Sequence, residues 1–184
     1  MKGIIVFLLC ALLQQDGLHK FKYWENFDGQ EKQAVLGDAN VPGIIKDLFY
    51  TQKPLGDDSE TECILEILSE PQTDRGRHAF YFYMFNKLFF KSDGALAEMV
   101  APYCYKLFIA DSKYVFAYIS RNSDLLDWYA CNIGSELAFA ELGVSEYSQM
   151  DYPTFEKQLL SENADTDCSR FLELVRQYRK SIFE

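Results

Sequence analysis

The chain has 184 residues, of which 48% are hydrophobic and 16% aromatic, and it carries a formal net charge of −10. This composition is that of a globular protein and excludes an intrinsically disordered chain, and the length fits one domain. The negative charge argues against a nucleic-acid partner, because phosphate binding needs clustered lysine and arginine side chains. It permits a basic protein or peptide partner.

The first fifteen residues have the order of a secretory signal. Lys2 supplies a positive charge, an apolar run extends from Ile4 to Leu13, and polar residues follow. An apolar core of this size is typical of a signal, whereas a membrane-spanning helix needs about 20 apolar residues. We therefore predict a signal peptide over 1–15, no membrane span, and an exported chain, periplasmic or extracellular, with a single helical domain over 16–184. The alternative is a short buried helix in a cytosolic fold.

The segment after the signal predicts short helices. Phe21 and Tyr23 alternate with lysines, which indicates a short strand or an extended arm. Gln30–Leu36 is expected to form a short helix that ends at Gly37, because glycine readily adopts the left-handed conformation found at helix ends. The next helix is predicted over 43–52, because isoleucine, leucine and phenylalanine recur there at helical spacing.

Two features dominate the middle of the chain. Ser59 and Glu62 match a capping box, in which two side chains satisfy the first free amides of a helix. A dense apolar run follows over 76–91, and its alternation of phenylalanine with tyrosine around residues 80–84 makes a strand a competing interpretation. A helix is favoured, because the run is long and Asn86, Lys87 and Lys91 keep one side polar.

Further helices are predicted in the second half, each opened by a residue that can cap free amides. The clearest is amphipathic and extends from Ser123 to Gly143; the others begin near Asp93, Asp111, Asp151 and Asp165. The fold class is therefore all-α with about eight helices. Helix pairs begin at intervals that resemble a helical repeat, although no residue pattern recurs. An irregular bundle and a short α-solenoid-like stack of helix pairs both fit, and we slightly favour the stack.

Removal of the signal takes Cys10 with it and leaves four cysteines. An even number in an exported chain permits two disulfides in any of three pairings. Each cysteine also lies on or beside an apolar stripe, so buried thiols are the favoured interpretation. The sequence contains no C-x-x-C, and neither a zinc site nor a redox motif is indicated. The four residues are Cys63, Cys104, Cys131 and Cys168.

Few residues suggest catalysis. His78 is one of only two histidines, and Glu136 lies beside the apolar stripe of the Ser123 helix, where it could serve as a pocket acid. Solvated carboxylates are far commoner. Gly134 and Ser135 do not form a nucleophile elbow, and close helix packing is the favoured role for Gly134.

No cofactor or metal is predicted. The Asn-x-Asp-x-Asp pattern at 163–167 resembles the opening of a calcium loop, but Cys168 replaces the required glycine and Leu174 the required glutamate. We therefore expect these residues to cap the last helix.

The aromatic helix offers the only candidate ligand site. Phe82, Phe85 and Phe89 are the residues that would line a pocket for an apolar ligand, although large apolar side chains usually form the core. The expected function is that of an exported, soluble, non-enzymatic protein that binds a protein or peptide, in the manner of an inhibitor or immunity protein. The alternatives are a hydrolase that uses an isolated carboxylate or histidine, and a carrier for an apolar ligand.

Overall fold

The computed structural model describes residues 21–51, 53–145 and 147–184, and these residues form no strand. The all-α prediction is confirmed, and the described residues form nine α-helices where about eight were expected. With one 3₁₀ helix they are η1 (Trp24–Asn26), α2 (Gly29–Gly37), α3 (Gly43–Thr51), α4 (Ser59–Ser69), α5 (Arg75–Phe89), α6 (Gly94–Ala110), α7 (Ser112–Ile119), α8 (Ser123–Glu141), α9 (Tyr152–Glu162) and α10 (Ser169–Ser181).

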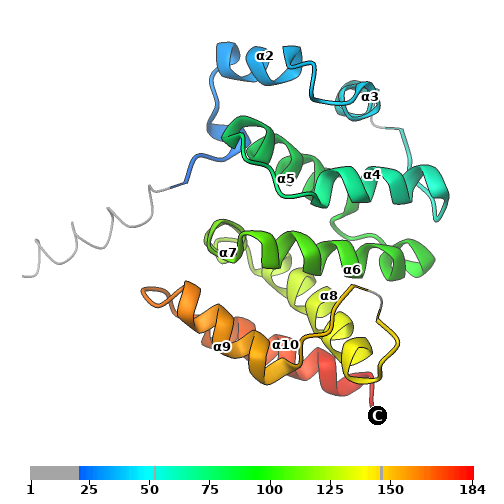
Figure 1. Ribbon diagram of the computed structural model, residues 1–184, viewed down its shortest axis with the longest axis vertical. Helices are drawn as coiled ribbons and strands as arrows, with labels where there is room; N and C mark the ends of the chain where they lie inside the picture. The colour runs from blue at the N-terminus through cyan, green and yellow to red at the C-terminus, as the bar shows by residue number, and fades with distance from the viewer. Residues whose placement is uncertain (1–20, 52, 146) are drawn as a thin grey trace, which may run out of the picture.

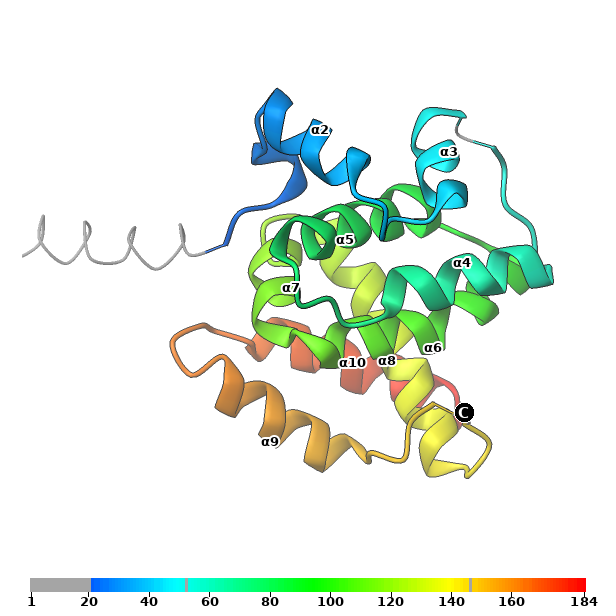
Figure 2. The ribbon, with the colours of Figure 1, turned by 45° about the horizontal axis from the view of Figure 1, so that its top comes forward.

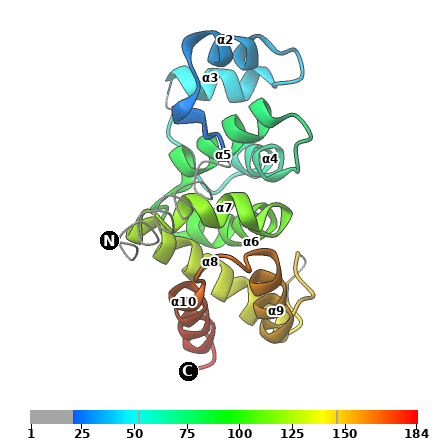
Figure 3. The same cartoon turned by 90° about the vertical axis from the view of Figure 1, so that its left-hand side faces the viewer.

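The helices follow one another in layers along the longest axis of the molecule. The order is α2 with α3, then α4 with α5, then α6 with α7, and finally α8, α9 and α10 (Figures 1 and 3). The last layer departs from simple pairing, because α8 packs chiefly against α10 and α6. Figure 2 shows α9 at the edge of the stack. This arrangement corresponds to a stack of helix pairs at one end and a small bundle at the other.

The predicted signal at 1–15 lies outside the described residues. Within the described ranges, no helix combines the length and the apolar character that a membrane crossing requires. The arm at residues 21–23 has no regular secondary structure, and the extended backbone of Tyr23 leads into η1. Of the two structures predicted for this segment, the arm is therefore the one present.

Helix starts follow the capping chemistry, with a shift of one residue at α4. Asp28 and Glu31 form a reciprocal capping box on α2. At α4, by contrast, the Asp58 carboxylate accepts the hydrogen bond from the Thr61 amide at 2.9 Å, and Ser59 is already helical. The capping box predicted at Ser59 is therefore wrong, because the preceding aspartate reaches the same free amides. The start predicted at Ser123 is confirmed, and Asn122 caps α8 from the preceding position.

One hydrophobic cluster extends from η1 to α10, and many buried side chains of α5 belong to it. The run over 80–90 belongs to a helix, as favoured, and the competing strand is not present. Phe80, Met84 and Phe85 are fully buried. Because both neighbouring layers cover this helix, its sequence is apolar on nearly every side, which explains the alternation that resembled a strand.

Candidate functional site

A cleft of about 700 Å³ lies near the N-terminal arm. Its walls come from the arm and α2, the turn before α5, the first turn of α5 and the junction of α6 with α7. We call it the His78 cleft, because His78 is the one histidine in its wall. It is lined by Phe21, Lys22, Phe27, Glu31, Pro71, Gln72, Arg75, Gly76, His78, Ala110, Asp111 and Tyr114.

His78 faces a carboxylate and an aromatic ring in this cleft. Its Nε2 atom lies 3.6 Å from Asp111 Oδ2, which is beyond hydrogen-bond distance, and its ring centroid lies 4.5 Å from that of Tyr114. Nε2 is buried and has no hydrogen-bond partner among the described residues. Burial lowers the pKa of His78, and the negative charge of Asp111 opposes that shift. The imidazole is therefore neutral near pH 7.

The two carboxylates of the cleft differ in whether both of their oxygens have ion-pair or hydrogen-bond partners. Glu31 forms an ion pair with Lys22 and also accepts a hydrogen bond from the Asp28 amide at 2.8 Å. Asp111 accepts a hydrogen bond from the Tyr114 amide through Oδ1 at 3.1 Å, which caps α7. Its other oxygen, Oδ2, faces only the neutral His78. Asp111 therefore keeps an oxygen available for a ligand.

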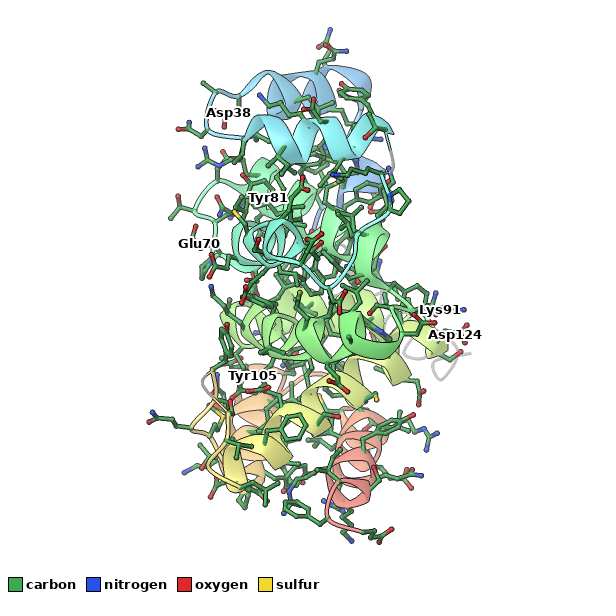
Figure 4. All side chains as sticks on the ribbon, turned by 90° about the vertical axis from the view of Figure 1, so that its right-hand side faces the viewer. Asp38, Glu70, Tyr81, Lys91, Tyr105 and Asp124 are labelled. Atoms are coloured by element: carbon green, nitrogen blue, oxygen red, sulfur yellow. The ribbon has the colours of Figure 1, made fainter. Side chains whose placement is uncertain are left out.

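A second cleft, of about 620 Å³, lies between the end of α5, α8 and α10. Phe90, Trp128 and Leu174 contribute to its apolar floor. Lys91 and Asp124 lie side by side at its rim (Figure 4), with Nζ and Oδ2 3.4 Å apart. Exposed ion pairs of this kind contribute little to stability or binding. Other polar side chains of this cleft already have partners, because Tyr178 donates a hydrogen bond to Asp127 Oδ2 at 2.8 Å and Arg170 pairs with Glu173.

The predicted ligand-binding phenylalanines lie in the core. Phe82, Phe85 and Phe89 are at most 2% exposed, and none of them lines either cleft. Phe82 packs edge-on against Tyr114 at 5.3 Å, and Phe85 lies 5.5 Å from Phe89. An apolar ligand would have to displace these ring contacts in order to reach them.

Glu136 holds a loop and does not share a cleft with His78. It is only 3% exposed and accepts a hydrogen bond from the Ser145 hydroxyl. The Ser145 oxygen in turn accepts hydrogen bonds from the amides of Tyr147 and Ser148. Tyr105 lies at the level of this loop (Figure 4). Burial raises the pKa of Glu136. The two candidate acid–base residues of the sequence are therefore not brought together.

All four described cysteines are free thiols, as favoured over disulfides. Cys104 and Cys168 are buried, whereas Cys131 is half-buried in the wall of the second cleft. Cys63 is exposed, which corrects the expectation that every thiol lies in the core. The apolar pattern of this helix predicted a buried position for Cys63, but Cys63 lies on the solvent-facing side of α4.

The residues that resemble a calcium loop form hydrogen bonds within the protein. The Asn163 amide donates hydrogen bonds to Ser112 and to the Leu159 carbonyl. Asp167 accepts a hydrogen bond from the Ser169 amide at the start of α10, as expected for a residue that satisfies a free helix amide. Across the described ranges, no group of three or more histidine, cysteine, aspartate or glutamate side chains is arranged to hold a metal ion.

Asp111 and Tyr114 are the site residues that the sequence did not reveal. They lie more than thirty positions after His78, and Asp111 was recognised only as a helix start. No motif links the three, because their contact depends on how α7 packs beside α5. Comparison with known proteins adds no further assignment: no protein-family model, curated protein or solved structure matches the chain.

Proposed function

We propose that this chain is an exported, non-enzymatic helical protein that binds a peptide or a protein segment in the His78 cleft. The observation that carries the proposal is the composition of that cleft. Aromatic rings from Phe21, Phe27 and Tyr114 line it together with the hydrogen-bonding side chains of His78 and Asp111. Ligand sites typically combine apolar walls with a few polar groups that fix orientation.

The chemistry of the wall favours a peptide over a purely apolar ligand. The Asp111 side chain is 40% exposed and its Oδ2 accepts no hydrogen bond from the described residues, whereas His78 Nε2 is buried and also has no partner among them. A peptide supplies both apolar side chains and polar groups, whereas an apolar ligand would leave these atoms unpaired at a cost in binding free energy.

The binding proposal is tested by filling the cleft. Ala110 lines it at the end of α6, and Ala110→Trp would occupy the space. Ala95→Trp is the matched control, because Ala95 is an exposed residue of the same helix. Peptides selected from a random phage-displayed library on the wild-type chain should bind Ala95→Trp and lose binding to Ala110→Trp. Equal binding to both variants would contradict the proposal.

Export rests on the order of charge, apolar run and polar residues over 1–15. Mass spectrometry of the native protein from fractionated cells tests it. The expected chain begins near residues 14–17 and is recovered outside the cytoplasm. Recovery of an intact Met1 in the cytoplasm would contradict export without affecting the binding proposal.

A hydrolase is the second candidate, and the position of His78 beside Asp111 favours it over one based on Glu136. The pair could activate a water molecule, with His78 as general base. The residues that line the cleft include no serine, threonine or cysteine, so covalent catalysis would lack a nucleophile there. A hydrolase screen with wild-type and His78→Gln chains distinguishes the candidates, since only an enzyme would lose activity in the variant.

A further inference from the structure

We propose that the His78 cleft recognises a basic side chain, a lysine or arginine flanked by apolar residues, with Asp111 as its carboxylate partner. This inference rests on the proposed function and specifies the ligand of the same cleft. Three observations support it: the Asp111 oxygen that pairs with no cation, the aromatic rings of the cleft and the negative charge of the whole chain.

The first step is the charge balance within the cleft. Lys22 and Glu31 form an ion pair and cancel each other. Asp111 and Arg75 are the remaining charged residues of the lining. Arg75 is exposed on the first turn of α5, where water screens its guanidinium. The Asp111 side chain is 40% exposed and its Oδ2 faces the neutral His78, so its charge is accessible to a ligand and is not cancelled by an ion pair.

The second step is that the cleft already accommodates one ammonium group in this way. Lys22 Nζ lies 5.1 Å from the centre of the Phe27 ring while it pairs with Glu31. A carboxylate beside an aromatic face is a favourable environment for a cation. Asp111 offers a similar combination, because it lines the same cleft as the Tyr114 and Phe21 rings, whose centroids lie 5.5 Å apart.

The net negative charge of the whole chain also favours a basic ligand. The formal charge of −10 attracts basic segments and repels acidic ones. Complementary charge raises the rate of encounter and disfavours partners of the wrong sign. A basic side chain thus fits both the unpaired Asp111 oxygen and the field around it. An acidic side chain would fit Arg75 alone.

The test uses two pooled heptapeptide libraries that share apolar residues around a central lysine or a central glutamate. Retention on the immobilised full chain is measured by mass spectrometry at physiological salt. The lysine pool should be retained about tenfold more than the glutamate pool, which corresponds to one charge-assisted contact. Asp111→Asn should remove this preference. Asparagine caps helices as well as aspartate does, so α7 is expected to form in the variant, and circular dichroism checks this.

Asp57→Asn is the matched control, because it makes the same change in net charge at an exposed loop residue outside the cleft. It should leave the lysine preference unchanged. Retention of the glutamate pool, lost in Ala110→Trp, would overturn this inference and leave the proposed function standing. Undiminished retention of the lysine pool by Asp111→Asn would also overturn it. Retention of neither pool would overturn this inference, and the random-library test with Ala110→Trp would decide the proposed function separately.

Discussion

Gly134 of α8 lies directly against the backbone of α10. A Cβ atom at this position would lie 2.8 Å from the Val175 carbonyl oxygen and 3.0 Å from the Arg179 amide nitrogen. The obstructing atoms belong to a helix backbone, so a side chain cannot rotate to make room. The absence of a side chain at residue 134 therefore sets how closely the two helices approach.

Gly134→Ala should lower the free energy of unfolding by about 1–3 kcal/mol, the usual cost of overpacking. The loss is expected even though alanine favours a helix more than glycine does. Urea denaturation measures it. Gly37→Ala is the control, since no heavy atom outside the immediate chain lies within 4 Å of a Cβ at Gly37. A Gly134→Ala chain as stable as the wild type would contradict the packing argument.

The fold was largely predictable, because helix periodicity and capping are local properties of a sequence. The amphipathic pattern after Ser123 and the close-packing role of Gly134 both agree with the structure. The error in capping is also local. The predicted cap at Ser59 falls one residue late, because Asp58 reaches the same amides and a sequence pattern does not decide between adjacent polar residues.

The candidate site was much less predictable. His78 was identified from its chemistry alone, and Asp111 was identified only as a cap. Their proximity arises because α7 turns back beside the first turn of α5, which is a property of packing between layers. A sequence without a known motif carries no signal for such a contact. The sequence also could not decide whether Phe85 lies in the core or lines a pocket, because both positions have the same helical periodicity.

The environment of His78 predicts a pH dependence of stability. Burial lowers the pKa of His78 below 6.5, and Asp111 only partly opposes this. The unfolded chain therefore binds the proton more readily than the folded chain does. Stability contributed by the neutral imidazole is complete above 6.5 and is lost as the pH falls through the lowered pKa.

The measurement compares wild-type and His78→Gln chains. Wild-type stability should fall more than that of the variant between about pH 7.5 and about pH 5.5. The second histidine, His19, is common to both chains and cancels in the comparison. A nuclear magnetic resonance titration that placed the pKa of His78 above 6.5 would contradict the assignment, because Asp111 would then outweigh burial.

Glu136 predicts the opposite dependence. Burial raises its pKa above 4.5, and the hydrogen bond from Ser145 only partly opposes this. The stability contributed by the protonated carboxyl is complete below about pH 4.5 and is lost as the pH rises through the raised pKa. Glu136→Gln, which stays neutral and can still accept the Ser145 hydrogen bond, should gain stability relative to the wild type across that rise.

Chemical denaturation at a series of pH values measures this difference. Glu98→Gln is the control, because Glu98 is exposed on α6 and its substitution should give a small difference that varies little with pH. Glu136→Gln could also be less stable than the wild type at every pH. That result would mean that the hydrogen bonds of the loop stabilise the ionised carboxylate more than burial destabilises it. The direction of the pKa shift would then be contradicted.

The four described thiols should react with a thiol reagent in the order of their exposure. Cys63 is exposed and should react first, and Cys131 should follow, since burial raises its pKa. Burial raises the pKa of Cys168 to about 11 and that of Cys104 well above its usual range. Because the thiolate is the reactive form, these two should react only as the chain unfolds.

Mass spectrometry of timed labelling with iodoacetamide identifies each site, and Cys63→Ser should remove the fastest phase without altering the others. The same experiment on the protein isolated from its native compartment tests the free-thiol state. An exported chain meets an oxidising environment, where burial would protect Cys104 and Cys168 from oxidation. Labelling of all four cysteines after unfolding without a reductant is the expected result, and a pair that labels only after reduction would contradict it.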